Sequence, residues 1–294
     1  MGILKNKRAY LIFLCPAVIF YLFSVFYPIV ESLRLSFLSW DGIGPMQFAG
    51  LSNYVSMFQD SVFWKSFVNN LVYLVIVVSM QLIIGLLTAI LLTYIGRGRN
   101  FIKTMYYVPC IITTIAVTQL FRSIYSYDPA GLFNILLKSV GLGGLAQSWI
   151  SNTRTVLAAV SIPEGWRFIG LYMVIFYSAL ISLSPDISEA ATIDGVNQFQ
   201  LLTRIKLPLI MPVIRLTLIM CLTGALRGFD IPFLLTSGGP GNSSELMATY
   251  MYKKAFTSMQ YGFGSSMAVF IVIESILVVL LINRIFRGEN DVGG

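Results

Sequence analysis

The chain has 294 residues, of which 56% are hydrophobic and only 11% are charged, with a mean hydropathy of +0.79. A soluble domain carries about 25% charged residues, so this composition excludes an ordinary soluble protein and indicates one that crosses a membrane several times. A net charge of +7 would fit a nucleic-acid partner in a soluble protein. Here the basic residues cluster at the ends of apolar runs, which is typical of membrane topology, and we expect no nucleic-acid partner.

The composition also excludes most catalytic and metal chemistry. Histidine is absent, which removes the usual metal ligand, the commonest proton shuttle and any Ser–His or Cys–His pair. The three cysteines lie far apart in apolar runs, with no spacing typical of disulfides or zinc: Cys15, Cys110 and Cys221. We therefore expect no enzyme activity, no metal and no cofactor in this chain.

Six apolar runs approach or exceed the roughly 20 residues that a bilayer core requires. They lie at 9–30, 71–95, 104–124, 166–184, 209–227 and 264–284. We expect six helices in one transmembrane domain that spans residues 1–294. The fourth helix has an alternative start near Val156, since the following residues are also apolar, but Pro163 and Glu164 interrupt that stretch. The first run is too long for the apolar core of a signal peptide, so we expect it to be retained.

Lysine and arginine near the ends of these runs predict the orientation. Three groups fall on one side if six helices alternate: Lys5, Lys7 and Arg8; Arg97, Arg99 and Lys103; Arg284 and Arg287. Both termini are therefore expected in the cytoplasm. On the opposite side, residues 125–165 contain an amphipathic segment, 132–140, that is too short to span and is expected either at the outer membrane interface or packed on the helix bundle.

One hydrophilic stretch, residues 184–208, separates the fourth and fifth runs. Ser184 is suited to cap a first helix with Pro185 at its first position. Gly195 is suited to end that helix, because glycine adopts the left-handed conformation without a Cβ clash. Asn197 is suited to cap a second helix, whose apolar stripe consists of Leu201, Leu202 and Ile205. The sequence therefore predicts two short helices joined by a bend.

Within this stretch, the order and spacing of a few residues resemble the cytoplasmic "EAA" loop of the membrane subunits of binding-protein-dependent ABC importers. These residues are Glu189, Ala190, Ala191, Asp194, Gly195, Ile205 and Pro208. The resemblance implies an all-α integral membrane protein with six transmembrane helices, of the type I ABC importer permease kind. It also implies that residues 185–207 dock on an ATPase subunit and transmit its motion. The simpler alternative is a polar loop that only joins two membrane helices.

The resemblance assigns roles within this loop. Glu189 would anchor it by charge-assisted hydrogen bonding, Ala190 and Ala191 would keep its surface small enough to enter a cleft, and Gly195 would fix the bend.

Other segments extend the resemblance over nearly the whole chain. The turn 238–241 reads Gly-Gly-Pro-Gly; without a following lysine it does not fit a phosphate loop, but it resembles a turn of the maltose-type carbohydrate-uptake permeases. Residues 227–230 read Arg-Gly-Phe-Asp, where the second of the two subunit types in that family usually has a Trp-Asn-x-Phe element, which favours the first subunit type for this chain.

The family also implies a set of partners. These are a second, homologous permease subunit, two ATPase subunits that hold ATP and Mg, and an extracytoplasmic substrate-binding protein. The chain would lie in the lipid of a bacterial-type inner or plasma membrane and translocate a sugar or oligosaccharide. It would carry no cofactor itself.

Candidate substrate contacts follow from the same resemblance and lie on the third, fourth and fifth helices. They are Thr114, Val117, Glu164, Phe168, Cys221, Gly224, Ala225 and Gly228. The small residues among them have two interpretations, since they either let helices approach closely or leave room for a ligand. Trp166 and Tyr172 are candidate aromatic platforms for a sugar ring.

Glu274 lies in the middle of the sixth run, where ionisable groups are costly. It is either part of an interhelical salt bridge or hydrogen bond, or the site of an ion-coupled secondary transporter. A second alternative is a membrane module that binds a partner through residues 185–207 and transports nothing. The expected function remains that of the permease subunit of an ATP-driven importer.

Overall fold

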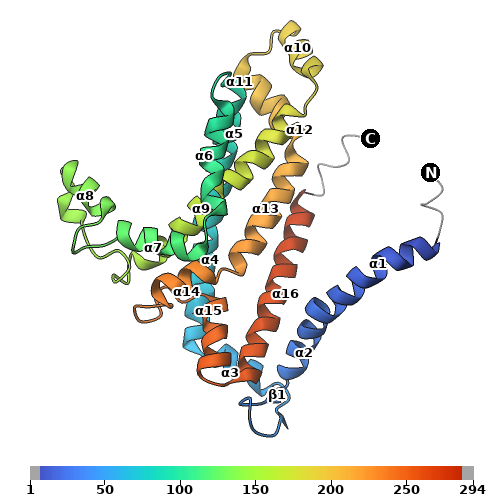
Figure 1. The fold of residues 1–294 in the computed structure, drawn as a ribbon, viewed down its shortest axis with the longest axis vertical. Helices are drawn as coiled ribbons and strands as arrows, with labels where there is room; N and C mark the ends of the chain where they lie inside the picture. Colours follow the sequence, from blue (N-terminus) through green and yellow to red (C-terminus); the bar gives the residue numbers. More distant parts are fainter. Residues whose placement is uncertain (1–6, 287–294) are drawn as a thin grey trace. The chain divides into compact units, whose positions relative to one another are not determined.

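The computed structural model describes residues 7–286 and divides into two compact units (Figure 1). The first unit comprises residues up to Phe63 together with Met251–Ile273. The second comprises Trp64–Tyr250 together with the residues from Glu274 onward. Four of the basic residues behind the predicted orientation, Lys5, Lys7, Arg8 and Arg287, lie outside the part whose side chains are described.

The first unit begins with one long helical segment. It consists of α1 (Lys7–Tyr21), a π-helical turn (Leu22–Phe26) and α2 (Tyr27–Leu35). Its apolar side chains are exposed along the membrane-length stretch Phe13–Leu35, none of which is buried. An apolar surface of this length requires lipid or another subunit to cover it.

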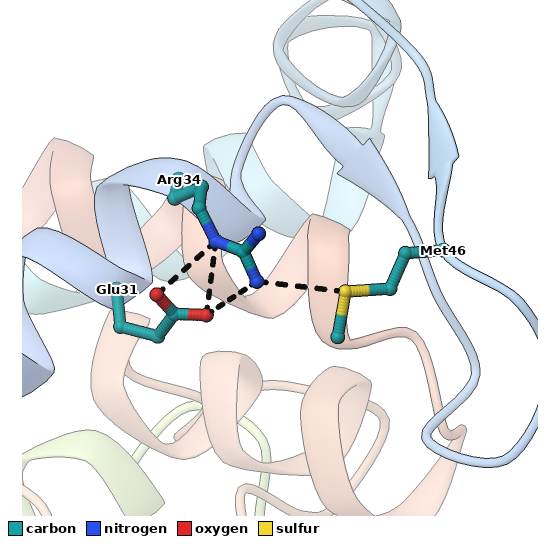
Figure 2. Close-up of polar contacts among 3 residues, drawn as sticks. All are labelled: Glu31, Arg34 and Met46. Atoms are coloured by element: carbon teal, nitrogen blue, oxygen red, sulfur yellow. Dashed lines mark hydrogen bonds and ion pairs between the residues drawn. The ribbon is translucent and has the colours of Figure 1, made fainter.

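A short polar sequence follows that helix and folds back on it. Strands β1 (Leu38–Ser39) and β2 (Gln47–Phe48) pair antiparallel, with Leu38 opposite Phe48. Figure 2 shows Arg34 at the end of α2, whose guanidinium pairs with Glu31 at 2.8 Å and reaches the Met46 sulfur at 3.6 Å. The charged end of the helix is thereby neutralised and tied to the β2 side of the loop.

Aromatic contacts hold the remainder of the first unit together. It contains α3 (Ser52–Gln59), the first residues of α4 (Ser61–Ser79), the end of α15 (Met247–Tyr252), a π-helical turn (Lys253–Thr257) and most of α16 (Tyr261–Ile285). Phe63 is fully buried and meets Phe58 and Phe270 edge-on at centroid distances of 5.8 and 5.3 Å. These edge-to-face contacts are the favoured arrangement of aromatic rings.

The second unit is a helical bundle with α9 (Val156–Ile181) at its centre. Before α9 come a π-helical turn (Met80–Ile84), α5 (Gly85–Tyr94), α6 (Arg99–Ile111), α7 (Thr114–Ile124), α8 (Leu132–Ser139) and a 3-10 turn (Gly143–Leu145). After α9 come α10 (Pro185–Ile193), α11 (Gln198–Gln200), a π-helical turn (Leu201–Lys206), α12 (Leu207–Leu209), α13 (Met211–Leu226) and α14 (Asp230–Thr236).

Small residues allow α9 to approach its neighbours closely. A Cβ atom on Gly170 of α9 would collide with the carbonyl group of Tyr106 on α6. On the other side, a Cβ on Gly85 of α5 would lie 3.3 Å from the Met173 backbone nitrogen. Met173 and Phe176 are fully buried in the resulting core. This is the small-residue packing common between membrane helices.

The predicted fold class is confirmed. In the described part of the chain, five helical stretches are long and apolar enough to cross a membrane: Phe13–Leu35, Ser61–Tyr94, Val156–Ile181, Met211–Thr236 and Tyr261–Ile285. A sixth span results when α6 and α7 are counted together. The six predicted runs match these spans in order.

The third span differs from the predicted continuous helix at 104–124. Instead, α6 ends at Ile111 and α7 begins at Thr114, with a bend of 99° between them. Ile112 and Thr113 adopt extended backbone conformations, and the Thr113 side chain caps α7 by accepting from the Ala116 backbone nitrogen at 3.4 Å. Hydropathy does not detect this break, because the residues on both sides of it are apolar.

The fourth span starts at the alternative position, Val156, and runs without a break to Ile181. The predicted interruption at Pro163 and Glu164 is therefore wrong, because membrane helices accommodate proline where neighbouring groups satisfy the freed backbone. The fifth span is predicted at 209–227, whereas the helix α13 ends at Leu226 and the short helix α14 extends the span to Thr236.

Candidate functional site

The hydrophilic stretch forms the two helices and the bend that its sequence predicts. Pro185 occupies the start of α10, and Gly195 has the left-handed φ of +75°. The Val196 amide donates to the Ala191 carbonyl at 3.0 Å, which closes the helix end. Asn197 caps α11 in a reciprocal capping box with Gln200, through bonds of 2.8 and 3.0 Å.

One cap differs from its prediction. Ser184 stands at the N-cap position of α10, but its hydroxyl bonds to the Asp186 carboxylate at 3.0 Å rather than to a backbone amide. The chain beyond α11 continues as a π-helical turn, so the predicted stripe is only partly internal: Leu201 is buried, while Leu202 and Ile205 are half-buried. Pro208 is exposed in α12.

The surface of this segment, Pro185–Gln200, is mixed in character. Glu189, Ala190, Asp194 and Gly195 are exposed, whereas Ala191 is buried. Only Ala190 of the two alanines therefore contributes surface. Two large apolar side chains that the sequence reasoning did not single out are also exposed, Ile193 at 86% and Phe199 at 73%. In Figure 1 this segment lies at one end of the second unit, beyond α5 and α6.

The exposed apolar pair has a detectable sequence signal. Ile193 and Phe199 lie on either side of Gly195 in a largely polar stretch. A short polar segment has little core in which to bury large apolar side chains, so such residues are candidates for exposure. The segment therefore exposes a carboxylate together with two large apolar side chains. We call residues 185–200 the docking segment, after the role that we propose for them below.

The structure separates the candidate substrate residues into packed and open positions. Val117, Cys221 and Ala225 are buried in the helix core. Gly228 is also packed, because a Cβ there would lie 2.7 Å from the Tyr73 ring. These positions serve close helix approach. Gly224, in contrast, is exposed, and a Cβ added there would have no atom within 4 Å, so it faces open space.

Arg167 organises the remaining candidates near the break between α6 and α7. Its guanidinium donates to the Thr114 hydroxyl at 2.8 Å and to the Ile112 carbonyl at 3.3 Å. It also lies 5.1 Å from the centre of the Phe168 ring, a cation–π arrangement. Arg167 interacts electrostatically with Glu164, which also faces Asp230. Arg167 therefore bonds both to the break, at Ile112, and to the first residue of α7, Thr114.

Three buried polar atoms of the second unit have no hydrogen-bond partner among the residues that the structure describes. They are the Tyr73 hydroxyl, the Asn70 Oδ1 and the Arg167 Nε. Tyr73 and Asn70 are fully buried on α4, and the Tyr73 side chain interacts electrostatically with Glu164 and Asp230. Because unsatisfied buried polar groups are costly, these atoms are suited to bind an internal water molecule. Sequence reasoning missed Tyr73, which lies among apolar residues of the second run.

The two candidate aromatic platforms differ in access. Trp166 lines a cavity of about 370 Å³ together with Met105, Tyr106, Pro109 and Ile169. Tyr172 is only 7% exposed, so it belongs to the core. Among the described residues, Glu274 has a buried carboxylate oxygen, Oε2, with no hydrogen-bond partner.

The glycine-rich turn is a rigid structural element. Lys65 of α4 donates to the Gly241 carbonyl at 2.7 Å, and Asn69 donates to the Asn242 and Glu245 carbonyls at 3.2 and 3.0 Å. Thr249 donates to the buried Glu245 carboxylate at 2.7 Å. These bonds fix the turn against α4, in keeping with a tight turn rather than a nucleotide site.

Comparisons with known proteins cover nearly the whole chain. The permease protein YurN of Bacillus subtilis (strain 168), a probable ABC transporter component, is 32% identical over 286 residues, which is 96% of this chain and 97% of the relative. The lactose transport system permease protein LacF of Rhizobium radiobacter is 30% identical over 266 residues, which is 89% of this chain and 88% of the relative.

A solved structure has the same fold. It is a chain of a bacterial ABC transporter involved in the import of the acidic polysaccharide alginate, with a TM-score of 0.83, 22% identity and coverage of 98% of both chains. The model of the family described as "Binding-protein-dependent transport system inner membrane component" matches residues 81–288. The chain therefore belongs to the family of inner membrane components of binding-protein-dependent transport systems.

Proposed function

We propose that this chain is the permease subunit of an ATP-driven importer that translocates a sugar or oligosaccharide. Membership of the family supports the importer role, and the names of relatives that transport lactose and alginate support the substrate class. The chain itself performs no catalysis. An extracytoplasmic binding protein delivers the substrate, and two ATPase subunits that hold ATP and Mg supply the energy.

The observation that carries the coupling role is the exposed docking segment. Ile193 and Phe199 are exposed, whereas the neighbouring Leu201 is buried and Asn197 caps the second helix. Their exposure costs free energy in water, since burial of a large apolar side chain is worth about 1.5–3 kcal/mol. A cleft on an ATPase subunit would cover them, and Glu189 would add a charge-assisted hydrogen bond at its rim.

The mechanism we propose is alternating access. When ATP closes the ATPase dimer, the docking segment moves with it as a rigid lever, because its two helices are closed by the Gly195 bend and the Asn197 capping box. The permease chain and a second, homologous permease subunit then rock about a cavity between them. The docking segment lies on the cytoplasmic side with both termini, as the basic residues at the helix ends predict.

The substrate path in this proposal passes the polar cluster of the second unit. The half-buried Glu164 and Arg167 side chains offer an acceptor and donors, respectively, to sugar hydroxyls. Gly224 leaves open space beside the cluster-bearing helices, and Trp166 adds an apolar face for a sugar ring. Thr114 and Phe168 act through Arg167, which contacts both.

The test is the substitution Phe199→Ala, with Phe48→Ala as the matched control. Both side chains are exposed, at 73% and 82%, so neither change removes core packing. We expect Phe199→Ala to reduce co-purification of the ATPase subunit from mild detergent and to lower uptake of radiolabelled lactose by cells. Phe48→Ala retains the ATPase. Equal ATPase recovery with both variants would contradict docking through this segment.

A further inference from the structure

The first unit contains an open cavity of about 470 Å³ whose lining residues all belong to that unit. Its walls come from the β1 strand and the turn after it, from α3, and from the segment between the π-helical turn 253–257 and α16. A volume in the range of about 300–1,000 Å³ is typical of small-molecule sites.

The walls of this cavity are held in place by specific contacts. Asn53 of α3 donates to the Ser36 and Leu38 carbonyls at 2.8 and 2.9 Å. A Cβ on Gly262 would collide with that Leu38 carbonyl, so α16 and β1 meet at van der Waals distance. Met259, which also lines the cavity, has a φ of +55°, a conformation that non-glycine residues rarely adopt. The cavity is therefore built by the fold.

The lining presents hydrogen-bond donors and acceptors together. Lys254 and Asp60 form an ion pair at 3.5 Å, and the Lys254 ammonium lies 4.8 Å from the centre of the Phe263 ring at the cavity wall. Asp41, Gln260 and Ser56 add a carboxylate, an amide and a hydroxyl, and Trp40 adds an aromatic surface. This combination of aromatic face, paired charges and neutral polar groups suits a polyhydroxyl compound.

A basic side chain of a docking protein fits the same cavity less well. The Lys254 ammonium would repel a second cation, and Asp60 already pairs with it. The remaining carboxylate, Asp41, accepts backbone bonds from Ile43 and Gly44 through its Oδ1 at 3.0 and 2.7 Å. A neutral saccharide, in contrast, uses acceptors and donors equally and has no charge to place, and an acidic saccharide has the Lys254 ammonium as a partner for its carboxylate.

We propose that this cavity is a second saccharide-binding site, lined by Trp40, Asp41, Ser56, Asp60, Lys254 and Gln260, on the loops between the membrane spans. The saccharide class rests on the proposed function, whereas the site itself rests on the geometry of the first unit. Such a site would hold one or two sugar units of the transported compound within the first unit.

The test fills the cavity without disturbing the core. Ser56→Trp places an indole in the cavity from α3, whereas Val55→Trp, the matched control, adds the same group to a neighbouring exposed position that does not line it. Saturation-transfer-difference NMR on the complete complex in lipid nanodiscs measures binding of lactose and of an alginate trisaccharide. We expect Ser56→Trp to reduce the transfer signal of at least one probe, with Val55→Trp equal to the unchanged protein.

Two outcomes overturn the proposal: no transfer signal from either probe in the unchanged complex, or equal signals in the two tryptophan variants. Gln260→Trp fills the cavity from its opposite rim and is expected to have the same effect, which guards against misfolding of a single variant. Uptake of the probes by cells separates the two claims. If cells take up a probe but the complex gives no transfer signal from the cavity, only the second site is contradicted. If cells take up no saccharide, the proposed function is contradicted.

Discussion

At the scale of single residues, glycine has two different roles in this chain: it allows close helix packing at one position and a left-handed backbone conformation at another. Gly170 is indispensable for packing, since a side chain there would enter the Tyr106 carbonyl. Gly195 has open space around it, but its φ of +75° is one that side chains disfavour. The sequence identifies Gly195, because it lies between two helix signals in a polar stretch. It does not identify Gly170, because glycine occurs at many positions of apolar helices, and the sequence does not show which helix packs against it.

Replacement of Gly195 by valine tests the lever role of the docking segment. The new side chain meets no neighbouring atom, so the effect is confined to backbone strain of about 1–3 kcal/mol, which opens the bend between α10 and α11. We expect ATP hydrolysis by the complex to continue while uptake falls. The control is Gly96→Val, which is also exposed and free of contacts but has no positive φ. If coupled uptake survived Gly195→Val, the lever assignment would be wrong.

Asp41 gives a pH dependence that is local to the first unit. The Gly44 and Ile43 amides hydrogen-bond to its carboxylate and lower its pKa. The ionised form therefore stabilises the turn above the ordinary carboxyl pKa of about 3.9, and that stabilisation is lost as the pH falls through the lowered value. We expect an NMR titration of the Gly44 amide to have its midpoint below about 3.9 and to vanish in Asp41→Asn. A midpoint at or above the ordinary value would exclude this turn in solution.

At the scale of elements, the sequence predicts the helices better than their breaks. Hydropathy locates six spans, and cap residues locate the bend at Gly195. The 99° bend between α6 and α7 escapes prediction, because both halves are apolar and hydropathy does not distinguish them from one straight helix. Arg167, which bonds to the Thr114 hydroxyl after the bend, is 53 positions away in the sequence, so the sequence pattern does not reveal this contact. Similarly, Pro163 looks like a helix boundary, yet α9 passes through it.

The close approach of α6 and α9 makes a prediction about stability. Gly170→Ala would force the Tyr106 backbone aside, and overpacking of this kind costs about 1–3 kcal/mol. We expect a lower thermal unfolding midpoint for the purified protein. The same substitution at Gly224, where no atom lies within 4 Å of the added group, should leave the midpoint unchanged. Equal midpoints for the two variants would mean that the two helices are further apart than the structure has them.

At the scale of the whole molecule, large apolar surfaces of the described chain remain uncovered. None of the helix Phe13–Leu35 is buried, and Ile193 and Phe199 are exposed in a polar segment. Composition predicts a membrane protein, and the EAA-like residues predict the family, but neither predicts which surfaces remain uncovered. The candidate substrate positions illustrate the limit: Cys221 and Gly224 are three residues apart, yet one is core and the other faces open space.

Glu274 separates the importer from an ion-coupled transporter. Its Oε2 is buried without a hydrogen-bond partner in the described chain, so a neutral amide is an acceptable replacement. We expect Glu274→Gln to transport its substrate at an unchanged rate, still dependent on ATP hydrolysis and independent of an imposed ion gradient, as measured in proteoliposomes that contain the complete complex. Uptake that an imposed ion gradient drives without ATP hydrolysis in the unchanged protein, and that is lost in Glu274→Gln, would favour the ion-coupled alternative.

The most direct test of the central claim is affinity purification of the tagged chain from a mild detergent, followed by an ATPase assay of the eluate. We predict that a second permease subunit and an ATPase subunit co-purify, that the eluate hydrolyses ATP, and that Glu189→Ala reduces recovery of the ATPase. A single polypeptide without ATPase activity, from a detergent that preserves related complexes, would contradict the account.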